Sequence, residues 1–340
     1  MKKNLFMLFF CWCSLNTINA QDAKAGEKID YTPKIQGTIR GKFEYQPEID
    51  ASRFQVRNAR FCITGKVHPI VDYKAEIDLS DEGVIRMLDA YTQLMLCKDL
   101  EFTIGQMRVP FTIDAHRSPH QQHFANRSFI AKQVGNVRDV GAMVGYTLES
   151  ALPIIAEAGA FNGSGLTEQK VWHKTLSYSA KIQFLFIPGM NLTLSAQSLK
   201  PENVRMSLFD AGFFYEFSNF HIEGEYLFKS YADHLFANVH AWNSFVYYDL
   251  FMKKGFEKIS FLIRYDRMTN NNNGYADNVT NMLPITDYRR YRLTGGITIS
   301  VSKPFISDIR INYENYCYPS SAIPKESERN KFVIELMTRF

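Results

Sequence analysis

The sequence lacks the long apolar runs that a helical membrane protein needs. After Ala20 no stretch stays apolar over the roughly 20 residues of a membrane-spanning helix. The mean hydropathy of −0.23 resembles that of soluble proteins. A bundle of transmembrane helices is therefore excluded. A membrane β-barrel is not, because its strands alternate lipid-facing and lumen-facing residues and average to neutral hydropathy.

Cysteine is scarce as well. The chain has five cysteines, of which Cys62, Cys97 and Cys317 follow Ala20. An odd number of widely spaced cysteines without a C-x-x-C motif fits neither a disulfide framework nor a zinc site. We therefore expect incidental thiols, no metal site and no cofactor.

A strong excess of one charge is also missing. Without the first 20 residues, which contain two lysines, 37 Lys and Arg face 35 Asp and Glu. This balance argues against a nucleic-acid partner. The sequence has no P-loop, H-E-x-x-H, G-x-S-x-G or dinucleotide fingerprint. A barrel phospholipase would need a lipid-facing Ser/His pair, and no spacing singles one out. We predict that the protein is not an enzyme.

The N-terminus has the features of a secretory signal peptide. Lys2 and Lys3 precede an apolar run over residues 5–12, and Ile18-Asn19-Ala20 resembles a cleavage site. We predict a signal peptide over residues 1–20 and a polar periplasmic segment over 21–33. An uncleaved anchor helix or a lipoprotein cysteine in this stretch are the alternatives.

From residue 34 onward the sequence alternates with a period of two. In the first segment Ile35, Ile39 and Phe43 lie on one face, opposite Arg40 and Lys42. Aromatic residues make up 14% of the chain, which suits the interfacial girdles of a barrel. Sixteen such segments occur, near 34–45, 52–66, 70–80, 86–97, 100–107, 138–149, 153–162, 174–187, 190–199, 206–217, 219–230, 239–252, 256–268, 288–302, 305–317 and 330–340. A phase break near Asn58 predicts a β-bulge.

The connections between these segments alternate in length. Short turns such as 188–189 and 218–219 alternate with mostly longer polar loops such as 108–137 and 268–287. Short periplasmic turns and long outer loops are typical of outer-membrane barrels. We therefore predict an all-β protein, with residues 34–340 forming a transmembrane antiparallel β-barrel of about sixteen strands in the outer membrane of a Gram-negative bacterium. Sixteen strands leave room for an aqueous channel.

The chain ends in an aromatic residue. Phe340 shares its face with Phe332, Ile334 and Leu336. A terminal aromatic on the lipid-facing side resembles the signal by which outer-membrane proteins are recognised for insertion. We therefore expect the barrel-assembly machinery and outer-membrane lipid, including lipopolysaccharide, among the partners.

The connection 108–137 is the longest and the most basic. Together with the next strand it carries Arg108, Arg117, Arg127, Lys132 and Arg138, against one acid, Asp114. Folded into the lumen as a long third loop, these cations would attract anions by focusing the field. We predict that the five contact anions at a pore constriction. An extracellular loop whose charges pair with lipopolysaccharide phosphates or face solvent is the alternative.

Three histidines of the same connection have two interpretations. His116, His120 and His123 would add partial positive charge at mildly acidic pH. Their spacing of four and then three residues would also let them share one face of a helical turn and bind a metal. Pro119 lies within that turn and no acid or cysteine completes the set, so we favour the first interpretation.

Basic residues also lie on the predicted lumen face of the strands. The main ones are Arg40, Lys42, Arg57, Arg60, Arg290 and Arg292. Acids such as Glu76, Asp78 and Glu335 share this face, so many of these charges are expected to pair across strands. A preference for anions therefore depends mainly on the connection 108–138.

Several sequence blocks in the first half resemble the phosphate-selective porin O and P family. They are Lys34-Ile35-Gln36-Gly37, Phe54-Gln55-Val56-Arg57-Asn58-Ala59-Arg60, Gly65-Lys66, Lys74-Ala75-Glu76-Ile77-Asp78, Leu88-Asp89-Ala90-Tyr91, Gly105-Gln106-Met107-Arg108-Val109-Pro110-Phe111 and Arg138-Asp139-Val140-Gly141. The resemblance implies a sixteen-stranded homotrimeric porin with a constricting third loop and a preference for anions such as phosphate.

We therefore predict passive diffusion of small hydrophilic solutes, with a preference for anions. A barrel plugged by its own loops, acting as an anchor or surface receptor, is the first alternative. A soluble all-β secreted protein is the second.

Overall fold

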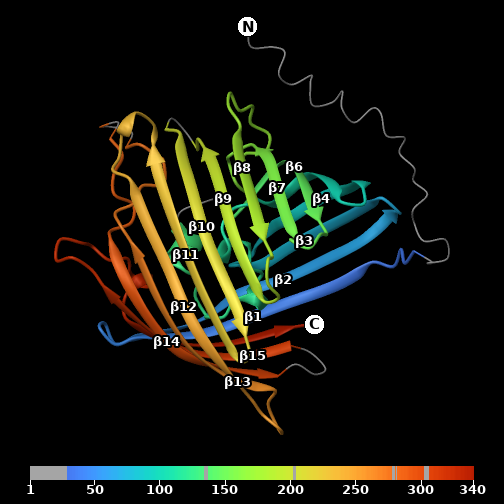
Figure 1. Ribbon diagram of the computed structural model, residues 1–340. Helices are drawn as coiled ribbons and strands as arrows, with labels where there is room; N and C mark the ends of the chain where they lie inside the picture. Colours follow the sequence, from blue (N-terminus) through green and yellow to red (C-terminus); the bar gives the residue numbers. More distant parts are fainter. Residues whose placement is uncertain (1–28, 134–136, 202–203, 278–279, 281, 302–305) are drawn as a thin grey trace.

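Sixteen antiparallel strands form a closed barrel (Figure 1). The computed structural model describes residues 29–133, 137–201, 204–277, 280, 282–301 and 306–340. The strands are β1 (Lys34–Gln46), β2 (Ala51–His68), β3 (Val71–Asp81), β4 (Val84–Cys97), β5 (Leu100–Arg108), β6 (Arg138–Leu148), β7 (Ile154–Phe161), β8 (Ser177–Phe184), β9 (Met190–Leu199), β10 (Met206–Phe217), β11 (Phe220–Tyr231), β12 (Val239–Phe251), β13 (Lys258–Met268), β14 (Arg290–Val301), β15 (Ile306–Cys317) and β16 (Lys331–Arg339).

Each strand pairs with its neighbours in sequence, and β1 pairs with β16. The predicted all-β barrel and its sixteen segments are confirmed, with strand ends within about three residues of the predicted ones. Among the described helices none has the length and apolar composition to cross a membrane. The predicted signal peptide over residues 1–20 and most of the segment 21–33 lie outside the described residues.

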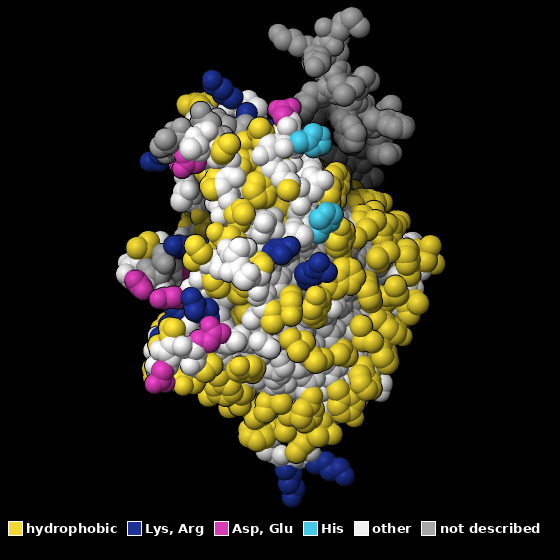
Figure 2. All heavy atoms as spheres, turned by 90° about the vertical axis from the view of Figure 1, so that its left-hand side faces the viewer, with side chains coloured by type: hydrophobic (Ala, Val, Ile, Leu, Met, Phe, Trp, Pro, Cys, Tyr) yellow, Lys and Arg dark blue, Asp and Glu magenta, His cyan; other side chains and the backbone are white. Residues whose placement is uncertain are grey.

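The two faces of the barrel wall differ as the alternation predicts. Large apolar side chains such as Phe54 and Ile35, which are 86% and 71% exposed, cover the outer face. Figure 2 shows hydrophobic side chains over much of one side of the molecule. The inner face carries charged and hydroxyl side chains, for example Arg40, Glu335 and Thr193. A closed ring with this pattern satisfies its backbone hydrogen bonds internally, as a bilayer requires.

The ring closes where the last residue meets the first strand. The backbone of Phe340 exchanges hydrogen bonds of 2.8 and 3.1 Å with Gly37. A Cβ on Gly37 would lie only 2.3 Å from the Phe340 ring, so a larger residue there would force this ring to shift. Phe340 also makes an edge contact with Phe61 on β2. The terminal aromatic is therefore part of the seam.

The predicted bulge lies in β2. Arg40 pairs with Asn58 while Gly41 pairs with Val56, so Arg57 is the extra residue. A bulge leaves one residue out of the ladder and redirects its side chain.

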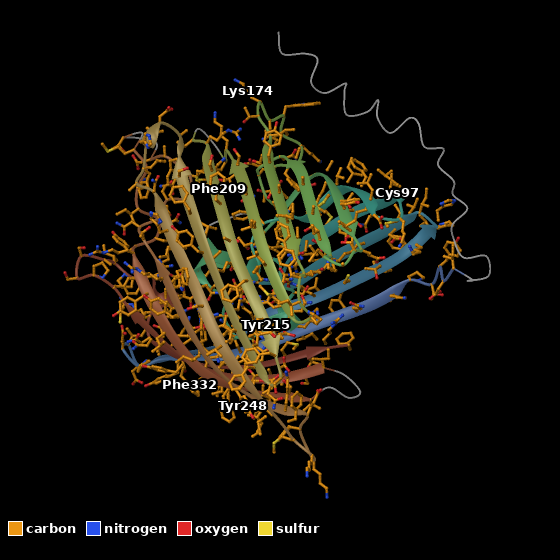
Figure 3. The ribbon with its side chains drawn as sticks, in the orientation of Figure 1. Cys97, Lys174, Phe209, Tyr215, Tyr248 and Phe332 are labelled. Atoms are coloured by element: carbon orange, nitrogen blue, oxygen red, sulfur yellow. The ribbon has the colours of Figure 1, made fainter. Side chains whose placement is uncertain are left out.

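The two rims differ in the length of their connections. Turns such as 69–70, 98–99 and 218–219 lie on one rim, which we call the short-turn rim, and the opposite rim carries 109–137, 162–176 and 269–289. On β10 to β12, at the short-turn rim, Tyr215, Phe217, Phe220 and Tyr248 form a row of ring contacts with centroids 4.8–5.6 Å apart. Figure 3 labels Tyr215 and Tyr248 in the lower half of the view. Such aromatic girdles lie at a membrane interface.

Candidate functional site

The connection after β5, residues 109–137, is called loop L3 here. Gly105 near the end of β5 has a φ of +131°, and a Cβ there would lie 2.3 Å from the carbonyl oxygen of Ala90. Glycine is therefore needed where the chain leaves the strand. L3 contains two short 3-10 helices, η2 (Asp114–His116) and η3 (Pro119–Gln121), and the helix α1 (Phe129–Gln133).

The first part of L3 contacts the inner face of β8, β9 and β11. The Ser179 hydroxyl donates to the carbonyl oxygen of Pro110 at 2.8 Å. The Thr112 N–H donates to the Ser195 hydroxyl at 3.1 Å. Arg117 forms a two-pronged ion pair with Glu223, one arm of it 2.7 Å long. Bidentate pairs of this kind fix both position and orientation.

The second part of L3 contacts β1 and β13 to β15. Here arginines of the wall donate to L3 carbonyl oxygens: Arg40 to Ala125 at 2.8 Å, Arg264 to Asn126 at 2.9 Å and Arg292 to Arg127 at 2.8 Å. The Ala125 N–H donates to the Asn312 side chain at 2.9 Å. Charged donors strengthen such bonds.

An apolar cluster packs α1 against the wall. Phe129 and Ile130 are 1% exposed and lie with residues whose side chains come from the inner face of several strands. Its buried members are Met107, Val109, Phe111, Phe129, Ile130, Phe161, Leu199, Val204, Met206, Leu208, Leu227, Tyr231, Val239, Ala241, Met268 and Tyr316. The two-residue alternation predicts a polar inner face, and this part of the wall departs from it. Apolar residues on the inner face of β9 to β12 were the signal in the sequence that another segment covers this face.

The five cations predicted to contact anions fall into two groups. Arg117, Lys132 and Arg138 form ion pairs with Glu223, Glu328 and Asp89 respectively, the last two at 2.8 and 2.6 Å. In the described part of the chain, Arg108 and Arg127 form no ion pair within 4.0 Å. They donate to carbonyl oxygens of L3 instead.

Most predicted basic residues of the lumen face are paired with acids. The pairs are Arg40–Glu335 at 2.6 Å, Lys42–Glu44 at 2.7 Å, Arg60–Asp78 at 3.0 Å, Arg290–Glu328 at 2.8 Å and Arg292–Asp266 at 2.7 Å. Arg57 differs. Its side chain is exposed, and among the described residues no acid lies within ion-pair distance of it.

Arg57 belongs to a group of six neighbouring arginines, which we call the arginine cluster. Its members are Arg40, Arg57, Arg60, Arg108, Arg127 and Arg138. Arg40 repels Arg57, Arg60 repels Arg138, and Arg127 repels Arg108 and Arg60. Burial lowers the pKa of Arg127 to about 9, and the charges of Arg108 and Arg60 act in the same direction. Arg127 still carries its charge at neutral pH.

The wall of β2 to β5 is more open than the rest. On its inner face the side chains of Lys66 and Lys74 are 40% and 22% exposed, and Cys62, Thr64 and Gln93 are half-buried. Inner-face residues of β9 to β15 are buried: Thr193 is 0%, Asn243 1% and Arg310 1% exposed. L3 contacts this second region and leaves Lys66 and Lys74 of the first partly accessible, whereas Glu76, Asp78 and Asp89 of the first are buried.

The three histidines of L3 do not add positive charge. Burial, followed by the nearby cations Lys181 and Arg108, lowers the pKa of His116 well below its ordinary value. Burial lowers the pKa of His120 to about 4. His123 is likewise lowered, by burial and then by Arg117. The expectation of partial charge at mildly acidic pH was therefore wrong.

The three rings also do not come together. His116 donates to the Val109 carbonyl oxygen at 3.0 Å, and its other nitrogen lies 3.3 Å from the Lys181 ammonium. The His123 ring instead lies 5.0 Å from the ring of His221 on β11. The spacing of four and three residues therefore pointed to the wrong partners.

The family comparison agrees with this architecture. The family described as "Phosphate-selective porin O and P" matches residues 34–206, just over half of the chain. The chain belongs to this family. The porin is thus an outer-membrane channel protein of a Gram-negative bacterium. A comparison with curated proteins finds no match.

Solved structures of outer-membrane barrels share the fold of this porin. The anion-selective porin from Comamonas acidovorans has 9% identity and a TM-score of 0.61 over 91% of this chain and 98% of its own. OmpT of Vibrio cholerae in its trimer form has 10% identity and a TM-score of 0.61, over 91% and 98%. The outer-membrane channel DcaP of Acinetobacter baumannii has 12% identity and a TM-score of 0.62 over 91% of this chain and 96% of its own.

Proposed function

We propose that this porin lets small hydrophilic solutes diffuse passively across the outer membrane, with a preference for anions. L3 lies in the lumen as the constriction in this proposal. The observation that carries it is the arginine cluster, where β1, β2, β5, β6 and L3 meet. Cations gathered in a water-filled passage with low-dielectric walls raise the local concentration of anions.

The solute passes between L3 and the inner face of β2 to β5. The half-buried and exposed inner residues of these strands support this path, because water-accessible side chains are expected along a passage. Arg57 is the best candidate for contacting the solute, since its side chain is exposed and no acid of the described residues forms an ion pair with it. Arg108 and Arg127, of the same arginine cluster, add positive field.

Oxyanions such as phosphate are the proposed preferred solutes. The guanidinium group donates two hydrogen bonds to one oxyanion, which suits phosphate better than chloride. The family's description and the anion-selective structural relative support this choice. The ion pairs of Arg60 and Arg138 with acids limit the preference, because paired charges contribute little field.

Bilayer electrophysiology tests the proposal. With a salt gradient across a planar bilayer, the reversal potential should show that anions pass more readily than cations. Arg57→Glu should reduce or reverse this selectivity. Lys254→Glu is the matched control, because Lys254 is an exposed residue of the turn between β12 and β13 at the short-turn rim. A wild-type protein that passes cations more readily than anions contradicts the anion preference.

A barrel plugged by L3 without transport is the second candidate function. The many contacts between L3 and the wall favour it. It predicts no steady conductance in the same experiment. We also propose a homotrimer, supported by the trimer form of the OmpT relative, which the mass of the detergent-solubilised protein tests.

A further inference from the structure

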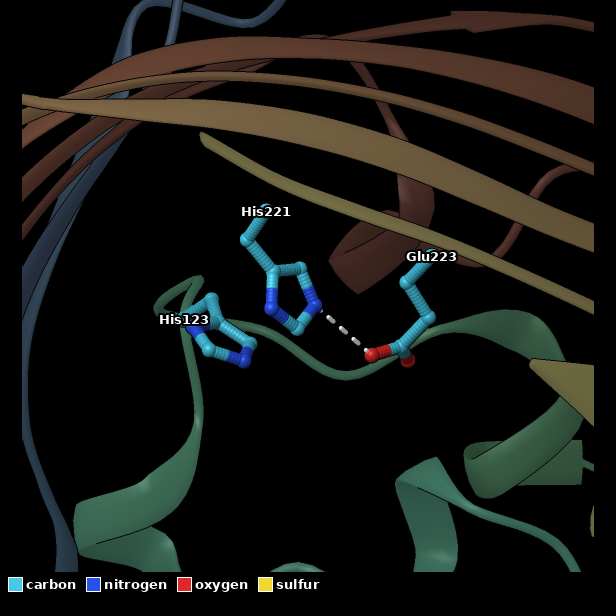
Figure 4. Close-up of side chains that lie close together, drawn as sticks. All are labelled: His123, His221 and Glu223. Carbon is cyan, nitrogen blue, oxygen red and sulfur yellow. Dashed lines mark hydrogen bonds and ion pairs between the residues drawn. The ribbon is translucent and has the colours of Figure 1, made fainter. Parts of the chain in front are cut away.

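A histidine pair and a carboxylate meet where L3 touches β11. His123 belongs to L3, and His221 and Glu223 belong to β11 (Figure 4). One potential ligand atom from each lies within 4.8 Å of the others. The His221 Nε2 atom is 3.1 Å from the Glu223 carboxylate. Two imidazoles and one carboxylate are the donor set of an open three-ligand zinc site.

We propose that this trio binds a divalent transition-metal ion, of which zinc is the best fit, and that the bound ion fastens L3 to the barrel wall. In a tetrahedral site with bonds near 2 Å, the ligands lie roughly 3.3 Å apart. The three side chains must therefore close by about an ångström or more. His123 lies on a loop and is half-buried, so it can supply most of this movement.

The surroundings of His221 support the assignment. Its other ring nitrogen, Nδ1, lies 3.2 Å from a carboxylate oxygen of Glu216. Metal-bound histidines commonly donate their second N–H to a carboxylate, which fixes the ring and raises its basicity. When the Nδ1–H of His221 donates to Glu216, the lone pair of Nε2 points toward Glu223. The metal would replace the contact between that nitrogen and Glu223.

Arg117 fixes the third ligand. It holds both oxygens of Glu223 through its bidentate ion pair. Each carboxylate oxygen has two acceptor positions, so one remains for a metal. Arg117 thus orients the carboxylate, and its charge keeps the affinity moderate.

An aromatic shell encloses the histidines. The His221 ring stacks on Tyr247 at 4.8 Å and 5° and on Phe245 at 5.3 Å and 14°. Phe214 covers it from β10 at 5.6 Å. Such a shell lowers the local dielectric and strengthens metal bonds. Glu216 is 57% exposed, so an ion can approach from the short-turn rim.

Zinc binding to the folded, detergent-solubilised porin tests the inference. Cys62, Cys97 and Cys317 are first changed to serine so that thiols do not compete for the metal. Equilibrium dialysis against Zn²⁺ should then show one site per chain. His123→Ala and His221→Ala should each weaken it at least tenfold, whereas Glu216→Gln should have a smaller effect.

His120→Ala is the matched control, since His120 lies in the same loop and outside the trio. Heat-modifiable gel migration, in which a folded barrel resists detergent until it is heated, verifies that each variant is folded. His123→Ala changes only the loop and keeps the test valid if His221→Ala fails to fold. The inference is overturned if the His123→Ala chain binds zinc as tightly as the His120→Ala chain.

Discussion

The inner wall of this porin has two regions of different character. On β2 to β5 inner side chains such as those of Lys66 and Lys74 are partly exposed, and ion pairs such as Lys66–Asp72 at 2.6 Å reach solvent. On β9 to β16 the inner side chains are buried, and pairs such as Arg310–Glu335 at 2.8 Å lie beneath L3. Both regions have the same two-residue alternation of apolar and polar side chains. The difference comes from L3, which packs on one region and spares the other.

Removing L3 should have the largest effect on this difference. Arg108 and Arg138 are direct partners across β5 and β6, so a turn of about four residues can replace 110–136. We expect the single-channel conductance to rise several-fold, because the buried region would become water-lined. The control replaces the outer loop 163–173 by the same kind of four-residue turn, which should change the conductance little. Equal conductance with and without L3 would remove it from the pathway.

Breaking one ion pair in each region compares their energetics. Glu335→Gln removes the Glu335 carboxylate from the buried Arg40 and leaves Arg310 with Asp308 alone, which should cost about 3–5 kcal/mol of stability. Asp72→Asn removes a partner from the exposed Lys66, which should cost less than about 1 kcal/mol. Urea-induced unfolding from lipid vesicles measures both. Equal losses would show that the two regions do not differ in burial.

Lowering the pH should loosen the contact between L3 and the wall slightly. The pKa of His116 is lowered in the packed loop, whereas in a released loop it would have the ordinary value of about 6.5. Below that pH the released loop gains a proton that the packed loop excludes, so packing is weaker at pH 5 than at pH 7.5. Asp114, whose pKa is lowered, stays charged over this range.

Current fluctuations recorded at pH 7.5 and at pH 5 measure this loosening. They should increase at pH 5, and His116→Gln should reduce the increase. A His116→Gln chain with an undiminished pH response would assign the effect to other groups.

The sequence predicted the strands well because each one repeats the same two-residue pattern. The bulge, the two rims and the closing residue were predicted from local signals, such as the phase break near Asn58 and the terminal Phe340. The site was predicted less well. Arg117, Lys132 and Arg138 have partners far away in the sequence, and nothing in their spacing reveals Glu223 or Glu328.

Long-range contacts also explain the other departures from the predictions. Arg57 is the extra residue of the bulge and has no strand partner on β1. This could be seen only once the register of β1 and β2 was known. His123 meets His221 because L3 lies against β11, 98 residues further along the chain by the sequence numbering. Which residues a loop contacts depends on its packing, and alternation carries no information on that.

A native thiol tests the proposed pathway most directly. Cys62 lies half-buried on the inner face of β2, between Gln36 and Glu76. An anionic thiol reagent applied during single-channel recording should reduce the current through a chain that keeps only this cysteine. In the matched chain, Cys62 is serine and Thr193→Cys places a thiol on the buried region of β9, and its current should stay unchanged. Block through position 193 with none through Cys62 would contradict a pathway along β2 to β5.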